Sequence, residues 1–242
     1  MTPSSRPVAS KEGRAGPTDL RARAARILKA LRRSRPDARI ELDFRSPYEL
    51  LVATILSAQC TDARVNKVTP DLFRAFPSPA ALAGADPAEL EALIRSTGFF
   101  RSKTKSLLGA SRAIQERHGG EVPRTMEDLA RLPGVGRKTA NVVLGGAYGI
   151  PSGIVVDTHV QRVARRLRLT RHEDPVRIER DLTALWPPSD WIFASIGLVL
   201  HGRYVCVART PKCPACALSR DCPSRILGGL TALRRSPGRA RD

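Results

Sequence analysis

The chain has 242 residues, 42% of them hydrophobic, and a formal net charge of +18. No apolar window is long enough to cross a bilayer, and residues 1–17 lack the apolar centre of a signal peptide. We therefore expect an intracellular, nucleoid-associated protein, with a weak transit peptide as the alternative. The charge favours nucleic acid as a partner. Part of it lies in residues 1–17 and 228–242, which we expect to be disordered basic tails.

Helical periodicity runs through most of the remaining chain. Asp86 followed by Pro87, and Thr125 followed by Asp128, are typical helix starts. The strand-like residues 154–156 are too few to build a sheet, so the sequence predicts an all-α fold. The expected helices cover 20–31, 47–58, 62–75, 87–95, 102–117, 126–131, 137–147, 158–168, 175–185 and 190–200.

The most informative stretch, residues 132–141, places a Pro-Gly-Val-Gly turn between two predicted helices. Gly134 and Gly136 break the chain there, and Val135 between them can point into the core while the backbone faces outwards. Free N–H groups at the positive end of the second helix favour a DNA phosphate, and Arg137 adds charge at the rim. The alternative is a turn with a structural role only.

Lys138 lies in the first turn of that second helix, where the helix dipole disfavours an ammonium ion. The same field favours the neutral amine that attack on a sugar carbon requires, and the alternative is phosphate binding. Asp157 precedes a further helix. It is either a plain N-cap or a carboxylate that faces the reacting sugar and stabilises positive charge or relays a proton. His159, two residues on, favours a structural role.

Four cysteines near the C-terminus follow the spacing C-x6-C-x2-C-x5-C: Cys206, Cys213, Cys216 and Cys222. Such a cluster in an intracellular protein favours a metal over disulfides. Structural zinc sites usually show two close pairs, whereas Cys213 and Cys216 are the single close pair here. The spacing therefore favours an iron–sulfur cluster and leaves zinc and disulfides as alternatives. Cys60 stands apart and is expected to be a small buried apolar residue.

In chain order, these features resemble the endonuclease III family of base-excision repair DNA glycosylases over roughly residues 20–225. The similar stretches, besides the cysteines, are 56–59, 132–141, 156–159 and 201–204. The resemblance implies a [4Fe–4S] cluster on the four cysteines. It also implies two helical domains with a cleft between them. One is a six-helix domain with a helix–hairpin–helix motif, and the other carries the cluster; their expected extents are 40–150 for the first and 18–39 plus 151–227 for the second.

Carried over by position, the resemblance makes Lys138 the nucleophile and Asp157 its catalytic carboxylate, in a cleft crossed by double-stranded DNA. The implied enzyme is a bifunctional DNA N-glycosylase and abasic-site (AP) lyase, acting as a monomer. The damaged nucleotide flips out of the duplex, Lys138 attacks C1′, and the base leaves. A Schiff base forms, and β-elimination cuts the strand 3′ to the abasic site. The implied substrates are oxidised or ring-saturated pyrimidines and abasic sites.

Two further residues of the resemblance would enter the duplex. Gln59 matches the residue that fills the hole left by the flipped base, with a plain polar residue at a helix end as the alternative. Phe99 lies where the family places a wedge that is often aliphatic, with a packed ring as the alternative. An aromatic ring there leaves opposite-base preference and damage range open. Gly145 and Gly146 also depart from good helix formers, for no reason visible in the sequence.

Two rival functions agree less well with the sequence. A monofunctional adenine-mismatch glycosylase of the same family lacks the hairpin lysine and has a glutamate in the helix before the glutamine. Here Lys138 is present, and no acid lies between Leu51 and Gln59. A non-catalytic DNA-binding or redox-sensing module would keep the turn and the cysteines without needing Lys138 and Asp157 together. The sequence favours the enzyme over both.

Overall fold

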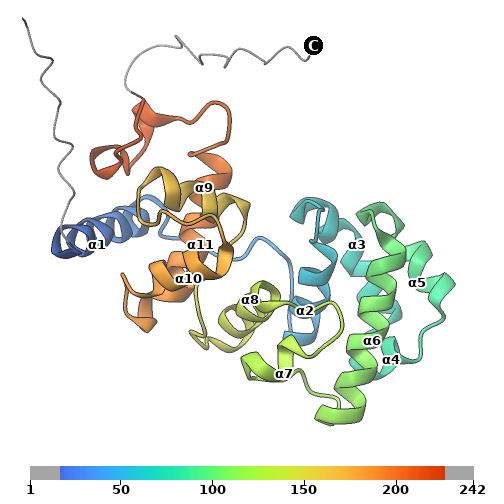
Figure 1. The fold of residues 1–242 in the computed structure, drawn as a ribbon. Helices are drawn as coiled ribbons and strands as arrows, with labels where there is room; N and C mark the ends of the chain where they lie inside the picture. Colours follow the sequence, from blue (N-terminus) through green and yellow to red (C-terminus); the bar gives the residue numbers. More distant parts are fainter. Residues whose placement is uncertain (1–16, 227–242) are drawn as a thin grey trace, which may run out of the picture.

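The computed structural model describes residues 17–226. They form eleven α-helices and three short 3₁₀ helices, with no β-strand in that range (Figure 1). The prediction of an all-α fold is confirmed. Both expected tails lie outside the described residues, except that Pro17 is the first residue of α1 (Pro17–Ser34). Within the described range, no helix has the length and apolar content needed to cross a membrane.

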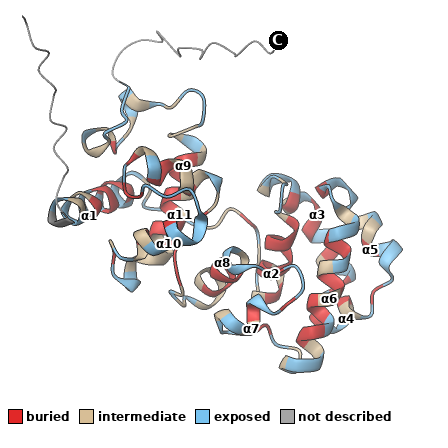
Figure 2. Ribbon diagram, in the orientation of Figure 1, coloured by how far each residue is buried: buried red, intermediate tan, exposed pale blue. Residues whose placement is uncertain are grey.

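One hydrophobic core lies in what we call the hairpin body, the helices α2 to α8. Nearly every residue of α2 is buried, so this helix runs through the centre of the body (Figure 2). Leu50 of α2 is fully buried in this core, as are Leu72, Leu90 and Leu129 of other helices. The helices are α2 (Pro47–Leu56), α3 (Asp62–Ala75), α4 (Pro79–Ala83), α5 (Pro87–Ile94), α6 (Phe100–His118), α7 (Met126–Ala130) and α8 (Arg137–Tyr148), with the 3₁₀ helix η1 (Arg95–Thr97) between α5 and α6.

A second core lies in what we call the cysteine body. Ile27 and Leu31 of the N-terminal helix pack there with Val163, Leu182 and Leu198 from the C-terminal half of the chain. Figure 1 shows α1 beside α11, far from it in sequence, on the left of the view. The body consists of α1, α9 (Thr158–Arg166), α10 (Pro175–Thr183) and α11 (Pro188–Tyr204), with the 3₁₀ helices η2 (Cys213–Ala215) and η3 (Ser219–Asp221).

Two connectors, residues 35–46 and 149–157, join the two bodies. The second is extended and contains the strand-like residues 154–156, which build no sheet in the described chain. Ile154 is fully buried in the second core, and the N–H of Val155 donates to the Ser195 hydroxyl 2.9 Å away. This connector therefore fixes Asp157, its last residue, against α11.

Side-chain caps set most helix starts, as the sequence predicted. The carboxylate of Asp86 accepts from two N–H groups in the first turn of α5, and the Thr125 hydroxyl accepts from the N–H of Asp128 at the start of α7. The short helix α4 was missed, although Ser78 caps it and Pro79 opens it in the usual way. Its five residues show too little periodicity to be recognised.

The glycines of α8 have a packing reason that the sequence did not reveal. A Cβ on Gly146 would lie 2.8 Å from Cδ2 of Leu50 and would also overlap Cδ1 of Ile40. Gly146 therefore allows α8 to approach α2 and the first connector closely. A Cβ on Gly145 would lie 3.4 Å from Cγ1 of Ile192, an ordinary contact distance.

Candidate active site

The turn between α7 and α8 has the conformation that a phosphate site needs. The N–H of Val135 donates to the carbonyl of Leu132 at 3.0 Å, and both side chains are buried, which anchors the turn in the core. Gly134 has a φ of 76° and lies against Ser106 of α6, where a Cβ would come 2.5 Å from the serine Oγ. Only glycine tolerates both this positive φ and the lack of space for a Cβ.

Gly136 is the N-cap of α8 and is exposed. As a glycine it offers no side-chain acceptor, so the first N–H groups of α8 are not capped by it. A Cβ at this position would meet nothing within 4 Å. The open space and the free helix end together leave room for an anion to reach the backbone.

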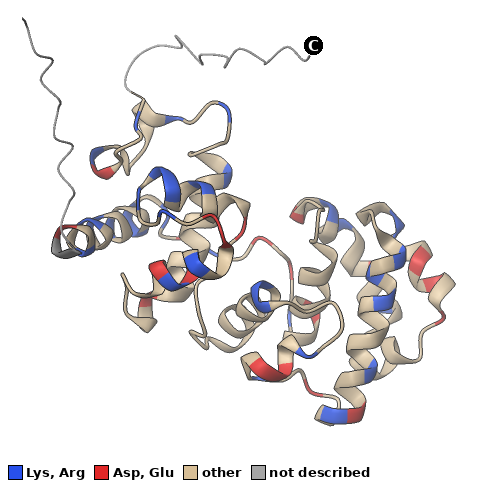
Figure 3. Ribbon diagram, in the orientation of Figure 1, with Lys and Arg blue, Asp and Glu red and all other residues tan. Residues whose placement is uncertain are grey.

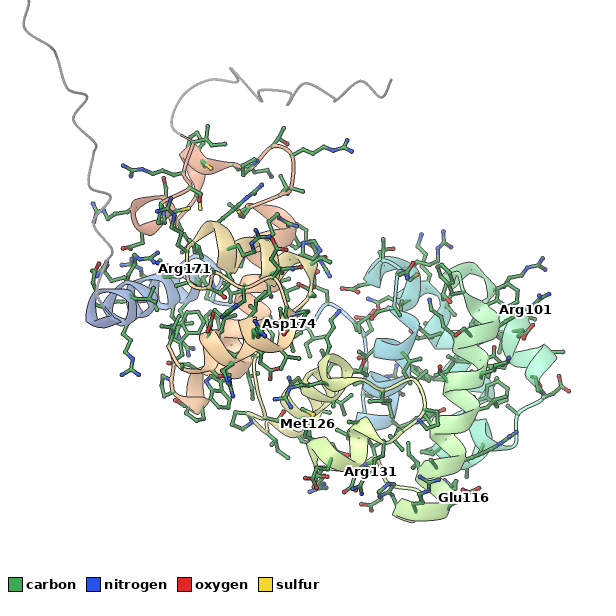
Figure 4. The ribbon with its side chains drawn as sticks, in the orientation of Figure 1. Arg101, Glu116, Met126, Arg131, Arg171 and Asp174 are labelled. Atoms are coloured by element: carbon green, nitrogen blue, oxygen red, sulfur yellow. The ribbon has the colours of Figure 1, made fainter. Side chains whose placement is uncertain are left out.

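Arg137 makes a contact between the two bodies that the sequence did not reveal. Its guanidinium donates from Nε and NH2 to Glu179 of α10, across the two bodies, at 2.7 and 3.0 Å. Asn141, one turn further along α8, donates to the same carboxylate at 3.1 Å. In Figure 4, Arg131 marks the end of α7 before the turn and Asp174 marks the start of α10. About half of the Arg137 side chain remains exposed.

Lys138 and Asp157 line one cavity between the two bodies, although they belong to different elements. Lys138 is exposed in the first turn of α8. Asp157 is the N-cap of α9, and its Oδ1 accepts from the N–H groups of His159 and Val160, both at 2.8 Å. Within residues 17–226, no group donates a hydrogen bond to its Oδ2. The carboxylate is thus held in orientation by one oxygen and offers the other.

Both parts of the chain supply the rest of this cavity. Thr54 and Asp62 come from the hairpin body, and Ser195 and Arg203 come from α11, with apolar side chains between them. The Arg203 guanidinium forms ion pairs with Asp62, at 2.6 Å, and with Glu41 of the first connector. These pairs close one side of the cavity and join α11 to the hairpin body.

Gln59 and Phe99 do not line the cavity; each lies in an exposed loop of the hairpin body. Both have left-handed backbone conformations, with φ of 52° and 48°, which non-glycine residues adopt rarely. The Phe99 side chain is 65% exposed, so the packed alternative does not describe it. Such conformations persist where the surrounding structure imposes them, and they cluster at functional sites.

The four C-terminal cysteines line one pocket of the cysteine body, and none of them is in a disulfide. Within residues 17–226, no three His, Cys, Asp or Glu side chains come together as a site for a single metal ion. Burial raises the pKa of the Cys216 and Cys222 thiols, and neighbouring thiols add to this. A bound cationic centre would reverse this effect and favour the thiolates.

Arginines of α9 organise the loop that carries these cysteines. Arg166 donates to the sulfur of Cys206 at 3.3 Å and to the carbonyls of Val207 and Ala208, at 2.8 and 2.7 Å. The pocket is also lined by Arg209, and other basic residues of the body lie along α1 and α9 (Figure 3). This environment suits a centre with negatively charged thiolate ligands. Cys60, expected to be buried, is half-buried against the first core.

Comparison with known proteins gives one consistent result. Residues 52–188 match the HhH-GPD superfamily of base excision DNA repair proteins. Endonuclease III of Synechocystis sp. is 57% identical over 202 residues, covering 84% of this chain and 92% of the relative. Endonuclease III of Escherichia coli K12 is 40% identical over 202 residues, covering 84% and 95%. The structure of a trapped endonuclease III–DNA covalent intermediate superimposes with a TM-score of 0.81 at 41% identity, covering 84% and 96%.

The fold and the turn before α8 thus define a helix–hairpin–helix DNA repair protein of the base-excision class. Within that class, the chain belongs to the endonuclease III family. It is therefore a DNA glycosylase with AP lyase activity, as the sequence predicted. A thermostable thymine-DNA glycosylase, at 24% identity and a TM-score of 0.75, shares the fold.

Proposed function

We propose that this enzyme removes oxidised or ring-saturated pyrimidines from double-stranded DNA and then cuts the strand 3′ to the abasic site, with Lys138 as nucleophile and Asp157 as catalytic carboxylate. The observation that carries the proposal is that these two residues, one from the hairpin body and one from the second connector, line a single cavity. The cavity thus brings an amine and an oriented carboxylate to one space, as attack on a sugar carbon requires.

The chemistry follows from the two groups. The neutral amine of Lys138 forms a bond to C1′ as the base leaves with the electron pair of the glycosidic bond and takes up a proton. Opening of the sugar ring gives an imine between Nζ and C1′. Loss of a C2′ proton then expels the 3′ phosphate, and water releases the product. Asp157, oriented by its cap bonds, would offset the positive charge at C1′ and accept the amine proton.

Double-stranded DNA is the proposed partner of a monomeric enzyme. The exposed N–H groups at Gly136 and the start of α8 would bind a phosphate, with the turn at Gly134 holding them in place. The exposed part of the Arg137 side chain would lie beside that phosphate. Gln59 would fill the hole left by the flipped nucleotide, and Phe99 would wedge between neighbouring bases. Their exposure supports these roles.

We also propose that the cysteine body is a domain that holds a [4Fe–4S] cluster, with boundaries near residues 40 and 150. The ligands would be Cys206, Cys213, Cys216 and Cys222, which line one pocket. Structural zinc sites usually have two close cysteine pairs, whereas Cys213 and Cys216 are the single close pair among these four. The spacing therefore favours a cluster, which would hold the loop together. None of the proposed chemistry passes through it.

The test is borohydride trapping on a duplex with one thymine glycol, followed by strand-cleavage assays on the same substrate. Wild type should give a covalent adduct that Lys138→Gln does not give. Lys29→Gln, which removes one exposed charge from α1, is the matched control and should trap normally. An adduct with Lys138→Gln would overturn the assignment. Base release without strand cleavage or adduct by wild type would overturn the Schiff-base step.

A further inference from the structure

Lys103, in the first turn of α6, is buried, with 5% of its surface exposed. Its Nζ donates to the carbonyl of Leu56 at 2.8 Å and to the carbonyl of Thr97 at 2.8 Å. Lysine is among the residues least often buried, and burial lowers the pKa of this ammonium. The first turn of a helix is also an unfavourable place for a positive charge. The two carbonyls must therefore compensate for both effects.

The two acceptors belong to the two loops that precede Gln59 and Phe99. Leu56 is the last residue of α2, three positions before Gln59. Thr97 is the last residue of η1, two positions before Phe99. Both carbonyls lie at the C-terminal ends of helices, where backbone oxygens lack helical partners and carry negative partial charge. The ammonium of Lys103 thus connects the ends of two elements. The carbonyl of Leu56 lies 47 residues before Lys103 in the sequence, and that of Thr97 lies 6 residues before it.

Both loops then turn sharply into an exposed residue with positive φ. Such a residue keeps its conformation when its flanking backbone is held. In Figure 1, the loop before α3 and the loop before α6 lie at the same end of the hairpin body. The bonds of Lys103 hold the flanking backbone of both loops at once. A shift of one loop therefore changes the position of the other.

We propose that Lys103 is a positioning residue for DNA entry: it fixes the separation of the Gln59 loop and the Phe99 loop, so that both side chains enter the duplex together when a nucleotide is flipped out. This inference rests on the proposed function, because it takes Gln59 and Phe99 as the residues that enter DNA. Lys103 is buried, so it contacts no DNA and acts through the two loops.

The proposal predicts that loss of Lys103 affects the reaction on paired duplex DNA more than the reaction on a single-stranded abasic site. Removing a base from a fully paired duplex requires the nucleotide to be unstacked and replaced, so it depends on both loops. Cutting an abasic site in a single strand requires no unstacking and depends on Lys138 and its surroundings. If Lys103 only stabilised the fold, its substitution would slow both reactions alike.

The experiment compares Lys103→Met, which keeps the length without the donors, with Lys103→Arg, which keeps charge and donors at a different reach. Lys105→Met is the matched control, since Lys105 is exposed on the same helix. Each variant is checked for folding by thermal melting and circular dichroism. Base excision is measured on a paired thymine-glycol duplex, and strand cleavage on a single-stranded abasic oligonucleotide. Flipping is followed by 2-aminopurine fluorescence next to the lesion.

For Lys103→Met we expect kcat on the paired duplex to fall at least about tenfold, with loss of the 2-aminopurine signal. Cleavage of the single-stranded abasic site should change less than about threefold. Lys103→Arg, which keeps hydrogen-bond donors for the two carbonyls, should show the same split to a smaller extent. Equal losses on both substrates, or no change in the ratio for Lys103→Arg, would overturn the proposal.

Combining Lys103→Arg with Phe99→Ala gives a second readout. If Lys103 acts through the Phe99 loop, the two substitutions should cost less together than the product of their separate effects. Lys138→Gln is run in parallel. Retained cleavage of the abasic site by that variant would defeat the proposed function, whereas the 2-aminopurine signal, which needs no bond breaking, would still decide the role of Lys103.

Discussion

The guanidinium of Arg137 and the carboxylate of Glu179 form a two-point ion pair that joins α8 to α10, with N–O distances of 2.7 and 3.0 Å. Glu179 is buried, and Asn141 donates to its Oε1 as well. Hydrogen bonding to Glu179 raises the pKa of Arg137. Because Lys138 directly follows Arg137, this pair fixes the proposed nucleophile relative to the cysteine body and so relative to Asp157.

The first prediction concerns Glu179→Gln. The amide removes the charge and one acceptor while Arg137 and Asn141 remain, so we expect a loss of about 1–2 kcal/mol, after allowance for the exposed half of Arg137. For a chain of this size, that lowers the melting midpoint by about 4 °C. We also expect a lower kcat, because the spacing between Lys138 and Asp157 is less fixed. Calorimetry and single-turnover kinetics measure the two effects.

Glu173→Gln provides the matched control. Glu173 pairs with Arg165 at 2.8 Å, but its side chain is 73% exposed. Such a pair contributes little, so neither the midpoint nor the rate should change measurably. If both variants behaved alike, the pair between α8 and α10 would have no special role in joining the two bodies.

The second prediction separates the two roles of Asp157. An asparagine retains an oxygen that can cap α9, so Asp157→Asn should keep the melting midpoint near that of wild type. Asp157→Ala loses both cap bonds and should be less stable by about 1 kcal/mol. Both variants lack the carboxylate, so both should turn over thymine-glycol DNA much more slowly. Near-normal turnover by the asparagine variant would reduce Asp157 to a cap.

Much of the local structure could be predicted from sequence because it depends on near neighbours. Caps such as Asp86 and Thr125 act within three residues, so the helix starts were recognisable. The partner of Arg137 is 42 residues away and was not recognisable. Lys103 likewise resembles any other lysine near a helix start, because nothing in the sequence shows that the carbonyls of Leu56 and Thr97 converge on it.

The third prediction concerns the two glycines of the turn, which have different physical requirements. Gly134→Ala forces a side chain into a left-handed conformation and against Ser106, so it should destabilise the fold by more than about 1 kcal/mol. Gly136→Ala meets no neighbour within 4 Å and has a negative φ, so it should cost less, at most about 1 kcal/mol for alanine at an N-cap.

The affinity for DNA tests the role of Gly136 separately from stability. A methyl group on Gly136 would lie where we propose that a phosphate approaches the backbone, so Gly136→Ala should bind duplex DNA more weakly while it remains folded. Fluorescence anisotropy at two salt concentrations measures this. If Gly136→Ala bound DNA as tightly as wild type, the phosphate would have to lie elsewhere.

The fourth prediction concerns the proposed cluster. Cys216→Ser removes one of four thiols that line the pocket, so the purified variant should contain less iron and lose the broad visible absorbance of an iron–sulfur centre. The loop between α11 and η3 should also become susceptible to protease. Cys60→Ser, outside that pocket, should retain full iron content. Stoichiometric zinc and no iron in wild type would contradict the proposal.

The fifth prediction opposes helix propensity to packing within α8. Replacing a helical glycine with alanine ordinarily stabilises a helix by about 1 kcal/mol. At Gly145 the new methyl group would lie 3.4 Å from Ile192, so Gly145→Ala should realise part of that gain. At Gly146 it would overlap Ile40 and lie 2.8 Å from Leu50. Overpacking of this kind costs about 1–3 kcal/mol, which outweighs the propensity. Chemical denaturation should therefore show opposite signs for the two variants. If both were stabilised, the close approach of α8 to α2 would not be the reason for Gly146.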